Sequence, residues 1–306
     1  MPIGGHDLEA AGERPGSSQT SGGTGPQDGS GSGTEDDPYI VKSAATLVEL
    51  LGEAGGLSAF YELHADLDLS NLDDWTPIGI GTAGFSGVFD GSGYSVHGLE
   101  FTTKNNEPWG LFATIAEDGV VRNLGIEDAD LRATGEAKEK GVLAAVNKGR
   151  IEQCFATGTV AGAEKLGGLV GLNGGEILQS YAVVRVDRGT LAGGLVGDND
   201  GGGILESYAA GLVEEDSGGA LAGRHTGGTI ERTFFDSDVN GDLPGVANDP
   251  EHPGVTALTN LQATSAETFT DEELEYFVDF DLDTVWAMDE ELNGGYPYLR
   301  ETPPSS

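Results

Sequence analysis

Positive charge, cysteine and long apolar runs are all scarce in this chain of 306 residues. Lys and Arg number 15 against 52 Asp and Glu, which gives a formal net charge of -37. No basic stripe is available to neutralise phosphates, so we expect no nucleic-acid partner. Cys154 is the single cysteine, which excludes an intrachain disulfide. No run approaches the roughly 18 apolar residues of a membrane-spanning helix, so we expect no membrane insertion.

A recognisable signal peptide is also absent. The chain begins MPIGGHDLEAAGERPG, without the basic segment and following apolar segment of an export signal. The sequence therefore leaves the export route open. We expect an extracellular or cell-surface location, with a virus particle as the alternative, because a virion component needs no signal of its own.

The acidic excess is spread along the chain rather than confined to a tail. Residues 1–37 hold seven acidic side chains and one basic side chain, which leaves a net charge of -31 on residues 38–306. Such self-repulsion is unfavourable in dilute buffer and is screened in molar salt, where the Debye length falls to about 3 Å. An acidic surface with little lysine is typical of extreme halophiles, so we expect adaptation to concentrated salt.

The composition and its changes along the chain predict four segments. Residues 1–37 are rich in Gly, Ser and acids and are expected to form a disordered tether. Residues 38–253 should form the main domain, beginning with a capping helix from Ala44 to Leu51 that follows Ser43 as its N-cap. Residues 254–300 are predicted to cap the other end, and residues 301–306 form a tail.

Internal repetition is the strongest signal in the sequence. Four columns of residues recur in phase at spacings of 26 or 27 residues. They are a leucine column (Leu143, Leu169, Leu195, Leu221), an isoleucine column (Ile151, Ile177, Ile204, Ile230), an aromatic column (Phe155, Tyr181, Tyr208, Phe234) and an asparagine column (Asn147, Asn173, Asn199, then His225).

This period predicts an all-β, right-handed parallel β-helix with coils of about 26 residues. It is too short for a propeller blade, and the leucine-rich-repeat consensus is missing. Stacked coils lie about 4.8 Å apart, so equivalent positions sit above one another. The leucine and isoleucine columns should fill the interior, and the aromatic column should form a stack. Exposed strand edges at both ends require caps.

Several segments together resemble a known family. GLFA, GLVGLNGGEILQSYA and GLVGDNDGGGILESYAAG resemble the GLUG motif, a repeat of bacterial and archaeal surface proteins that also occurs in some IgA-protease-like adhesins. DPYIVKSAATLVELL and FSGVFDGSGYSVHGLEF look like the module that precedes such repeats, and VWAMDEELNGGYPYLR looks like their ending. The resemblance implies a right-handed β-helix on an exported surface protein and implies no catalytic activity.

One segment suggests a metal. Asp236, Asp238, Asn240 and Asp242 have the spacing that opens an EF-hand calcium loop, and Gly241 could make its sharp turn. The twelfth position is Ala247 rather than a bidentate Glu, and no flanking helices are predicted. We expect either a Ca²⁺ site or a solvated acidic turn.

No catalytic constellation is evident, so we predict a protein that is not an enzyme. Cys154 shares its column with Ser180, Ser207 and Thr233, which favours a structural role. Asp66 and Asp68 could be the paired carboxylates of a polysaccharide lyase or glycosidase, but carboxylates are abundant throughout.

Three functions remain open at this point. The first is an adhesion, attachment or structural module on the surface of a halophile, binding a cell-envelope protein or glycan. The second is a spike, fibre or capsid-decoration protein of a halophilic virus, and the third is a polysaccharide-active β-helix enzyme. A homo-oligomer or display on a larger assembly would suit the first two. We also expect Asp198, in a turn after the leucine column, to be exposed.

Overall fold

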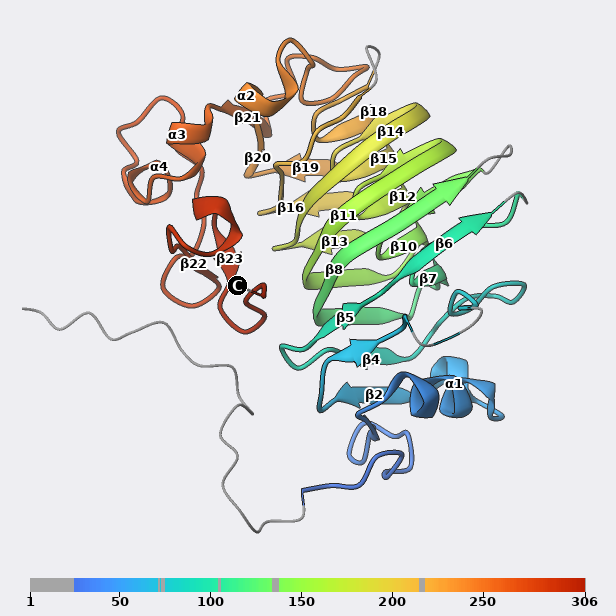
Figure 1. Ribbon diagram of the computed structural model, residues 1–306. Coiled ribbons are helices and arrows are strands. Elements are labelled where there is room, and N and C mark those ends of the chain that lie inside the picture. The colour runs from blue at the N-terminus through green and yellow to red at the C-terminus, as the bar shows by residue number, and fades with distance from the viewer. Residues whose placement is uncertain are drawn as a thin grey trace, which may run out of the picture.

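Short strands separated by glycine-containing turns wind this chain into a parallel β-helix, which confirms the predicted fold class (Figure 1). The computed structural model describes residues 25–70, 72, 75–103, 106–133, 138–214 and 218–305. Strands of the coil pair in parallel with the equivalent strands of the next coil, commonly 26 residues further along the chain, and β22 and β23 form a separate antiparallel pair.

The first coils contain short strands and the capping helix. Their elements are β1 (Tyr39–Val41), α1 (Ala44–Gly52), η1 (Gly56–Ser58), β2 (Phe60–Leu63), β3 (Leu67–Asp68), β4 (Val88–Asp90), β5 (Ser95–His97), β6 (Glu100–Thr103) and β7 (Phe112–Ile115).

The repeat region follows with the longest strands. Its elements are β8 (Val120–Ala133), β9 (Glu139–Gly141), β10 (Ala144–Asn147), β11 (Arg150–Gly167), β12 (Val170–Asn173), β13 (Glu176–Leu178), β14 (Tyr181–Gly193), β15 (Val196–Asn199), β16 (Gly203–Leu205), β17 (Tyr208–Ala209), β18 (Ala222–His225), β19 (Thr229–Glu231) and β20 (Thr233–Asp236).

The last part of the chain has short elements. They are α2 (Ser237–Asn240), β21 (Val255–Leu258), α3 (Asn260–Ala263), α4 (Glu267–Thr270), β22 (Trp286–Ala287), η2 (Asn293–Gly295) and β23 (Tyr298–Leu299).

Two parallel sheets enclose the interior of the coil. The larger sheet follows the order β1-β2-β4-β8-β11-β14-β17-β20-β21, with shorter strands paired beside this path, and the second has the order β18-β15-β12-β10-β7. The leucine and isoleucine columns lie inside, where every leucine of its column is fully buried and each isoleucine is at most 3% exposed. Ile151, Ile177, Ile204 and Ile230 are register partners in successive coils.

A column of glycines immediately precedes the recurring GLVG-like segments. Each of these glycines stands two residues before the leucine of its coil, and the chain turns there from the larger sheet to the smaller one. A Cβ on Gly167 would lie 1.9 Å from the Val170 carbonyl oxygen, and one on Gly219 would lie 1.9 Å from that of Ala222. Any larger residue would therefore push the two sheets apart.

The asparagine column is buried at the turn that leaves the smaller sheet. Asn147 Nδ2 donates to Asn173 Oδ1 at 2.8 Å, and Asn173 Nδ2 donates to Asn199 Oδ1 at 2.8 Å. In the next coil His225 takes the position, with its Nδ1 3.0 Å from Asn199 Nδ2. Since buried amides need partners, the amide-to-amide contacts fix the stacking of successive coils.

Helix α1 lies at the first coils, and its N-cap is the predicted one: Ser43 Oγ accepts from Thr46 N at 3.2 Å. The predicted tether boundary at residue 37 is wrong, because residues 25–37 are part of the fold. Asp28 accepts hydrogen bonds from Lys42 N (2.8 Å), Ser43 Oγ (2.8 Å) and Thr46 Oγ1 (2.7 Å), which ties this segment to the helix. Residues 1–24 of the predicted tether lie outside the described residues.

The predicted cap at the C-terminal end also needs correction. Strand β21 pairs in parallel with β20, so the coil continues past residue 253 to Leu258. Residues 259–305, called the strap below, then lie along the side of the β-helix instead of across its end (Figure 1). The strap reaches back to early coils, where Ser305 N donates to Glu127 Oε2 at 3.0 Å.

The aromatic column is on the outside of the coil, underneath the strap. Phe155, Tyr181, Tyr208 and Phe234 are fully buried and belong to a second hydrophobic cluster, separate from the interior. Strap residues Phe269, Phe280 and Trp286 complete this cluster. The aromatic residues alternate along their strands with small residues that face inward, as the two-residue period of a strand requires.

Candidate functional site: a polar ladder on an outer corner

One corner of the coil carries an unusual backbone conformation. Five residues in successive coils, none of them glycine, have φ close to +50°. We call this set the outer ladder: Asn123, Gln153, Gln179, Glu206 and Arg232. Each immediately precedes the column that contains Cys154, Ser180, Ser207 and Thr233. Because left-handed backbone is unfavourable for such residues, the repeat of this conformation marks a corner that the stacking of coils enforces.

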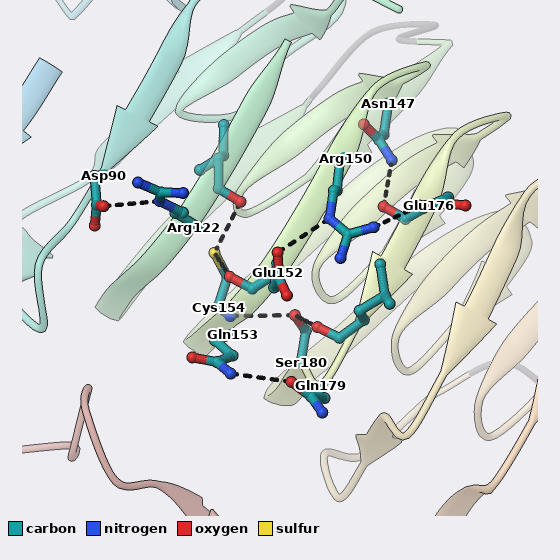
Figure 2. A network of polar contacts seen from close by, with 12 residues as sticks. Asp90, Arg122, Asn147, Arg150, Glu152, Gln153, Cys154, Glu176, Gln179 and Ser180 are labelled. Carbon is teal, nitrogen blue, oxygen red and sulfur yellow. Dashed lines mark hydrogen bonds and ion pairs between the residues drawn. The ribbon is translucent and has the colours of Figure 1, made fainter. Parts of the chain in front are cut away.

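The last four side chains of the outer ladder form a continuous hydrogen-bonded row, while Asn123 donates to Asp90. Gln153 Nε2 donates to Gln179 Oε1 at 3.0 Å, and Gln179 Nε2 donates to Glu206 Oε2 at 2.8 Å. Arg232 Nη2 completes the row by donating to Glu206 Oε1 at 2.5 Å. Figure 2 shows the first of these contacts. The row places amides, a carboxylate and a guanidinium at the spacing of the coils.

Ion pairs between coils lie beside this row. Arg122 Nε is 2.7 Å from Asp90 Oδ2, and Arg150 bridges Glu152 at 3.0 Å and Glu176 at 2.8 Å (Figure 2). The bond to Glu152 is the main reason why the pKa of Arg150 is raised. The few basic side chains are therefore placed where they neutralise acids of the same and the neighbouring coil.

The column of small residues that follows the outer ladder connects adjacent coils by buried hydrogen bonds. Ser180 Oγ accepts from Cys154 N at 3.1 Å, and Ser207 Oγ accepts from Ser180 N at 3.1 Å. Burial raises the pKa of the Cys154 thiol to about 12, so it carries no thiolate at neutral pH. These contacts fit the structural interpretation of Cys154.

Asp198 differs from its prediction. Its side chain is fully buried, not exposed, because Arg224 and Lys165 cover it. Arg224 binds both oxygens, at 2.9 and 2.6 Å, and Lys165 Nζ is 3.3 Å from Oδ2. Burial alone would raise the pKa of Asp198, but the two cations outweigh it and lower the pKa. A carboxylate covered in this way acts as a brace between coils.

The proposed calcium ligands are directed to different partners. Asp236 caps α2 by accepting from Asp238 N (2.8 Å) and Val239 N (3.1 Å), and it also accepts from the Tyr296 hydroxyl. Asn240 Oδ1 accepts from Val213 N at 2.9 Å, while Asp238 Oδ2 accepts from Asn260 N at 3.0 Å. In the structure, the segment whose spacing suggested a calcium loop builds a capped turn of helix that anchors the strap, and calcium binding there stays a prediction.

Asp242, the fourth proposed calcium ligand, is exposed in the loop after α2. Within the described part of the chain, no group of three or more His, Cys, Asp or Glu side chains is arranged to hold a metal ion. His225 and His252 do meet, with ring centroids 5.2 Å apart, which their sequence spacing does not predict. Burial, and secondarily His252, lowers the pKa of His225.

The paired carboxylates suggested for an enzyme are bound to backbone and hydroxyl groups. Asp66 Oδ1 accepts from Ser95 N in the next coil at 2.8 Å. Asp68 Oδ1 accepts from Ser70 N at 2.9 Å and from Ser70 Oγ at 2.5 Å. Both carboxylates therefore contribute to turn and coil geometry. No helix in the described ranges is long and apolar enough to cross a membrane.

The fold and the outer ladder define an acidic parallel β-helix protein with a repeated polar exterior. Comparison with known proteins adds two relatives that are similar over part of the chain. A protein described as a Gly-rich membrane protein, from Evansella cellulosilytica, is 32% identical over 127 residues, which is 40% of this chain and 15% of that protein. Halomucin of Haloquadratum walsbyi is 32% identical over 82 residues, 27% of this chain and 1% of halomucin.

The chain thus spans a small fraction of the length of these curated relatives. No protein-family model matches it. Among solved structures, a protein described as an immunoglobulin A1 protease from Bacteroides ovatus superposes with a TM-score of 0.54 over 89% of this chain and 95% of that one. The sequence identity is 17%, so this similarity shows the shared fold alone.

Proposed function

We propose that this protein is a non-enzymatic attachment or structural module on the surface of a halophile, and that its outer ladder contacts a cell-envelope protein or glycan. The observation that carries this proposal is the continuous row from Gln153 through Gln179 and Glu206 to Arg232. The row offers hydrogen-bond donors, acceptors and charges at a regular spacing, which suits an extended partner with repeated polar groups.

The distribution of charge supports a saline setting. The net charge of -37 leaves the exterior strongly acidic, while Arg122, Arg150 and Arg224 are engaged in ion pairs. These ion pairs weaken the repulsion between coils locally. Elsewhere, dissolved salt must screen it. Partial similarity to halomucin of Haloquadratum walsbyi, a halophile protein by its name, supports the same setting. The location we propose is the cell exterior, in a protein of the GLUG-repeat type.

Weak individual contacts are expected from a row of single polar side chains. Affinity would then come from display of several copies, since linking binding modules raises avidity by roughly 10²-fold or more without new contacts. The test uses biotinylated protein, either alone or assembled on streptavidin, added to halophile envelope preparations in molar NaCl. We expect the tetramer to bind with an apparent Kd at least about tenfold lower than the monomer.

A ladder variant identifies the face. This variant combines Gln153→Asn, Gln179→Asn and Glu206→Asn. The shorter side chains break the hydrogen bonds between coils, while Asn tolerates the left-handed backbone. The matched control is Glu117→Gln with Asp118→Asn, two exposed acids in the turn between β7 and β8. The ladder variant should lose most of the tetramer binding and the control should keep it. Equal binding by both variants would contradict the assignment of this face.

The same protein should release no products from acidic or neutral polysaccharides. Reducing-end and unsaturated-product assays in molar salt measure this directly. Product release that disappears when one or two acidic residues are replaced would overturn the non-enzymatic proposal.

A further inference from the structure

The strap covers a surface that resembles a protein interior. The rings of the aromatic column are stacked nearly parallel, with centroids 5.0 Å apart for Phe155 and Tyr181, 4.9 Å for Tyr181 and Tyr208, and 4.5 Å for Tyr208 and Phe234. Trp286 of the strap lies across them, with its centroid 5.8 Å from that of Tyr208. Burial of these rings is the main attraction that holds the strap in place.

Polar contacts join the strap to the coil at a few points, including those already described at Asp238 and Glu127. Tyr208 Oη donates to the Pro297 carbonyl at 2.5 Å, Asn293 Nδ2 donates to Tyr208 Oη at 2.7 Å, and Tyr296 reaches Asp236. In the same contact the buried Tyr181 hydroxyl and Trp286 Nε1 have no hydrogen-bond partner. Each such buried polar atom weakens the docking of the strap, because water would satisfy it on release.

Charge opposes the docking as well. Residues 259–306 carry twelve acidic side chains and one basic side chain, Arg300, a net charge of -11. Residues 38–258 carry 33 acidic and 13 basic side chains, a net charge of -20. Arg300 Nη2 donates to the Leu282 carbonyl, so the one cation is used within the strap. These two strongly acidic parts of the chain are therefore held together by apolar contact and by the hydrogen bonds at a few points, against their mutual repulsion.

We propose that the strap is a salt-gated cover over the aromatic column. In molar salt the Debye length of about 3 Å screens the repulsion and the strap stays docked. When the salt concentration falls, repulsion acts across the whole interface, while the coils keep their backbone ladders and their cross-coil ion pairs. The strap is released first and exposes a strip of four aromatic rings on a still folded β-helix.

Amide hydrogen exchange across a series of NaCl concentrations tests this directly on the intact chain. Peptides from residues 259–300 should lose protection at a higher salt concentration than peptides from β11 and β14. Fluorescence of the buried Trp286, in a Trp75→Phe, Trp109→Phe background, should shift to longer wavelength at the same salt concentration as the strap peptides. Loss of protection in strap and coil at one common salt midpoint, or no loss in the strap, would overturn the proposal.

A charge variant separates electrostatic release from general weakening. Replacing the exposed Asp271, Glu272 and Glu273 with Asn, Gln and Gln lowers the strap charge to -8 and should move its release to lower salt. Glu117→Gln with Asp118→Asn, on the coil, should move it less. An equal effect of the two charge variants would show that the repulsion is not between strap and coil, and would also count against the proposal.

Discussion

Asp198 and Arg224 face each other across adjacent coils, with Arg224 Nε 2.9 Å from Oδ1 and Nη2 2.6 Å from Oδ2, although the aspartate is fully buried. The two residues are register partners on β15 and β18. Lys165, from the larger sheet, adds a second cation to the same carboxylate. This carboxylate therefore connects three coils and both sheets. Its replacement measures how much such a contact contributes to the stability of the stacked coils.

Replacement of Asp198 by Asn should lower the free energy of unfolding at pH 7 by about 1–3 kcal/mol, because two partly covered cations lose their counter-charge. The pKa of Asp198 is lowered in the folded protein, so its contribution is present above the usual carboxyl pKa and is lost as pH falls through the lower folded value. The difference between parent and variant should shrink on acidification. Chemical unfolding at several pH values measures it.

The exposed Asp200 provides the control for this substitution. Asp200→Asn should change the free energy of unfolding by no more than about 0.5 kcal/mol. Equal effects of the two Asp→Asn changes would show that the buried ion pair contributes nothing.

The repeat register predicts a large difference between two leucines. Leu195 is fully buried between coils, whereas Leu261 on α3 is 80% exposed. Leu195→Asp places an uncompensated charge in the interior and should cost several kcal/mol, about 4 or more. Leu261→Asp should change stability by less than about 0.5 kcal/mol. Thermal unfolding followed by circular dichroism compares them, and similar midpoints would refute the register.

The burial of Lys140 predicts that protein stability depends on pH in the alkaline range. Its amine is fully buried with no hydrogen-bond partner, and lies 5.5 Å from the centroid of the Phe101 ring. Burial lowers the pKa of Lys140 to about 8. Between that value and the ordinary value of about 10.4, Lys140 binds more protons in the unfolded chain than in the folded one, so its own contribution to stability should rise with pH.

Lys140→Met should remove this rise and stabilise the protein at pH 7 by on the order of 2 kcal/mol. The exposed Lys148, changed to Met, is the control and should leave the pH profile of stability unchanged. The difference in melting temperature between the parent and Lys140→Met isolates this contribution from other groups that titrate in the same range, such as Cys154. A difference that stays constant between pH 8 and about 10 would show that the buried ammonium is not destabilised.

The loop of Asp236, Asp238, Asn240 and Asp242 predicts little response to calcium. Its oxygens accept from backbone, from Asn260 and from Tyr296, so a cation would have to displace those donors. Millimolar CaCl₂ should raise the melting temperature no more than MgCl₂ at equal ionic strength. Titration calorimetry with a heat signal that disappears in Asp238→Ala would restore the calcium site.

The parts of the fold that the sequence predicts are those where one residue type recurs in register. Leucine, isoleucine, aromatic and asparagine columns repeat because a stacked coil puts the same chemical demand on the same position each time. The outer ladder escapes this reasoning because Gln153, Gln179, Glu206 and Arg232 share a backbone conformation instead of a side-chain type. A column of long polar residues just before the small-residue column is the signal that could have revealed it.

The position of the strap and the burial of Asp198 could not be predicted from the repeats, for a different reason. The strap has no repeat, so its hydrophobic residues indicate a covering role without indicating which surface they cover. Asp198 occupies a position whose register partners are Leu172 and Arg224, and its burial depends on Lys165 from the other sheet. A contact between the two sheets is a tertiary contact, and the 26-residue period does not predict it.

Adaptation of an acidic repeated coil to concentrated salt is the central claim, and the melting temperature of the coil as a function of NaCl tests it most directly. Far-UV circular dichroism follows the β-helix itself between about 3 M and about 0.05 M NaCl, over which the Debye length grows from under about 3 Å to more than 10 Å. With a net charge of -31 on residues 38–306, repulsion then acts between neighbouring coils, and we predict that the melting temperature falls steadily as salt is removed. A melting temperature that stays constant over this range would contradict the account.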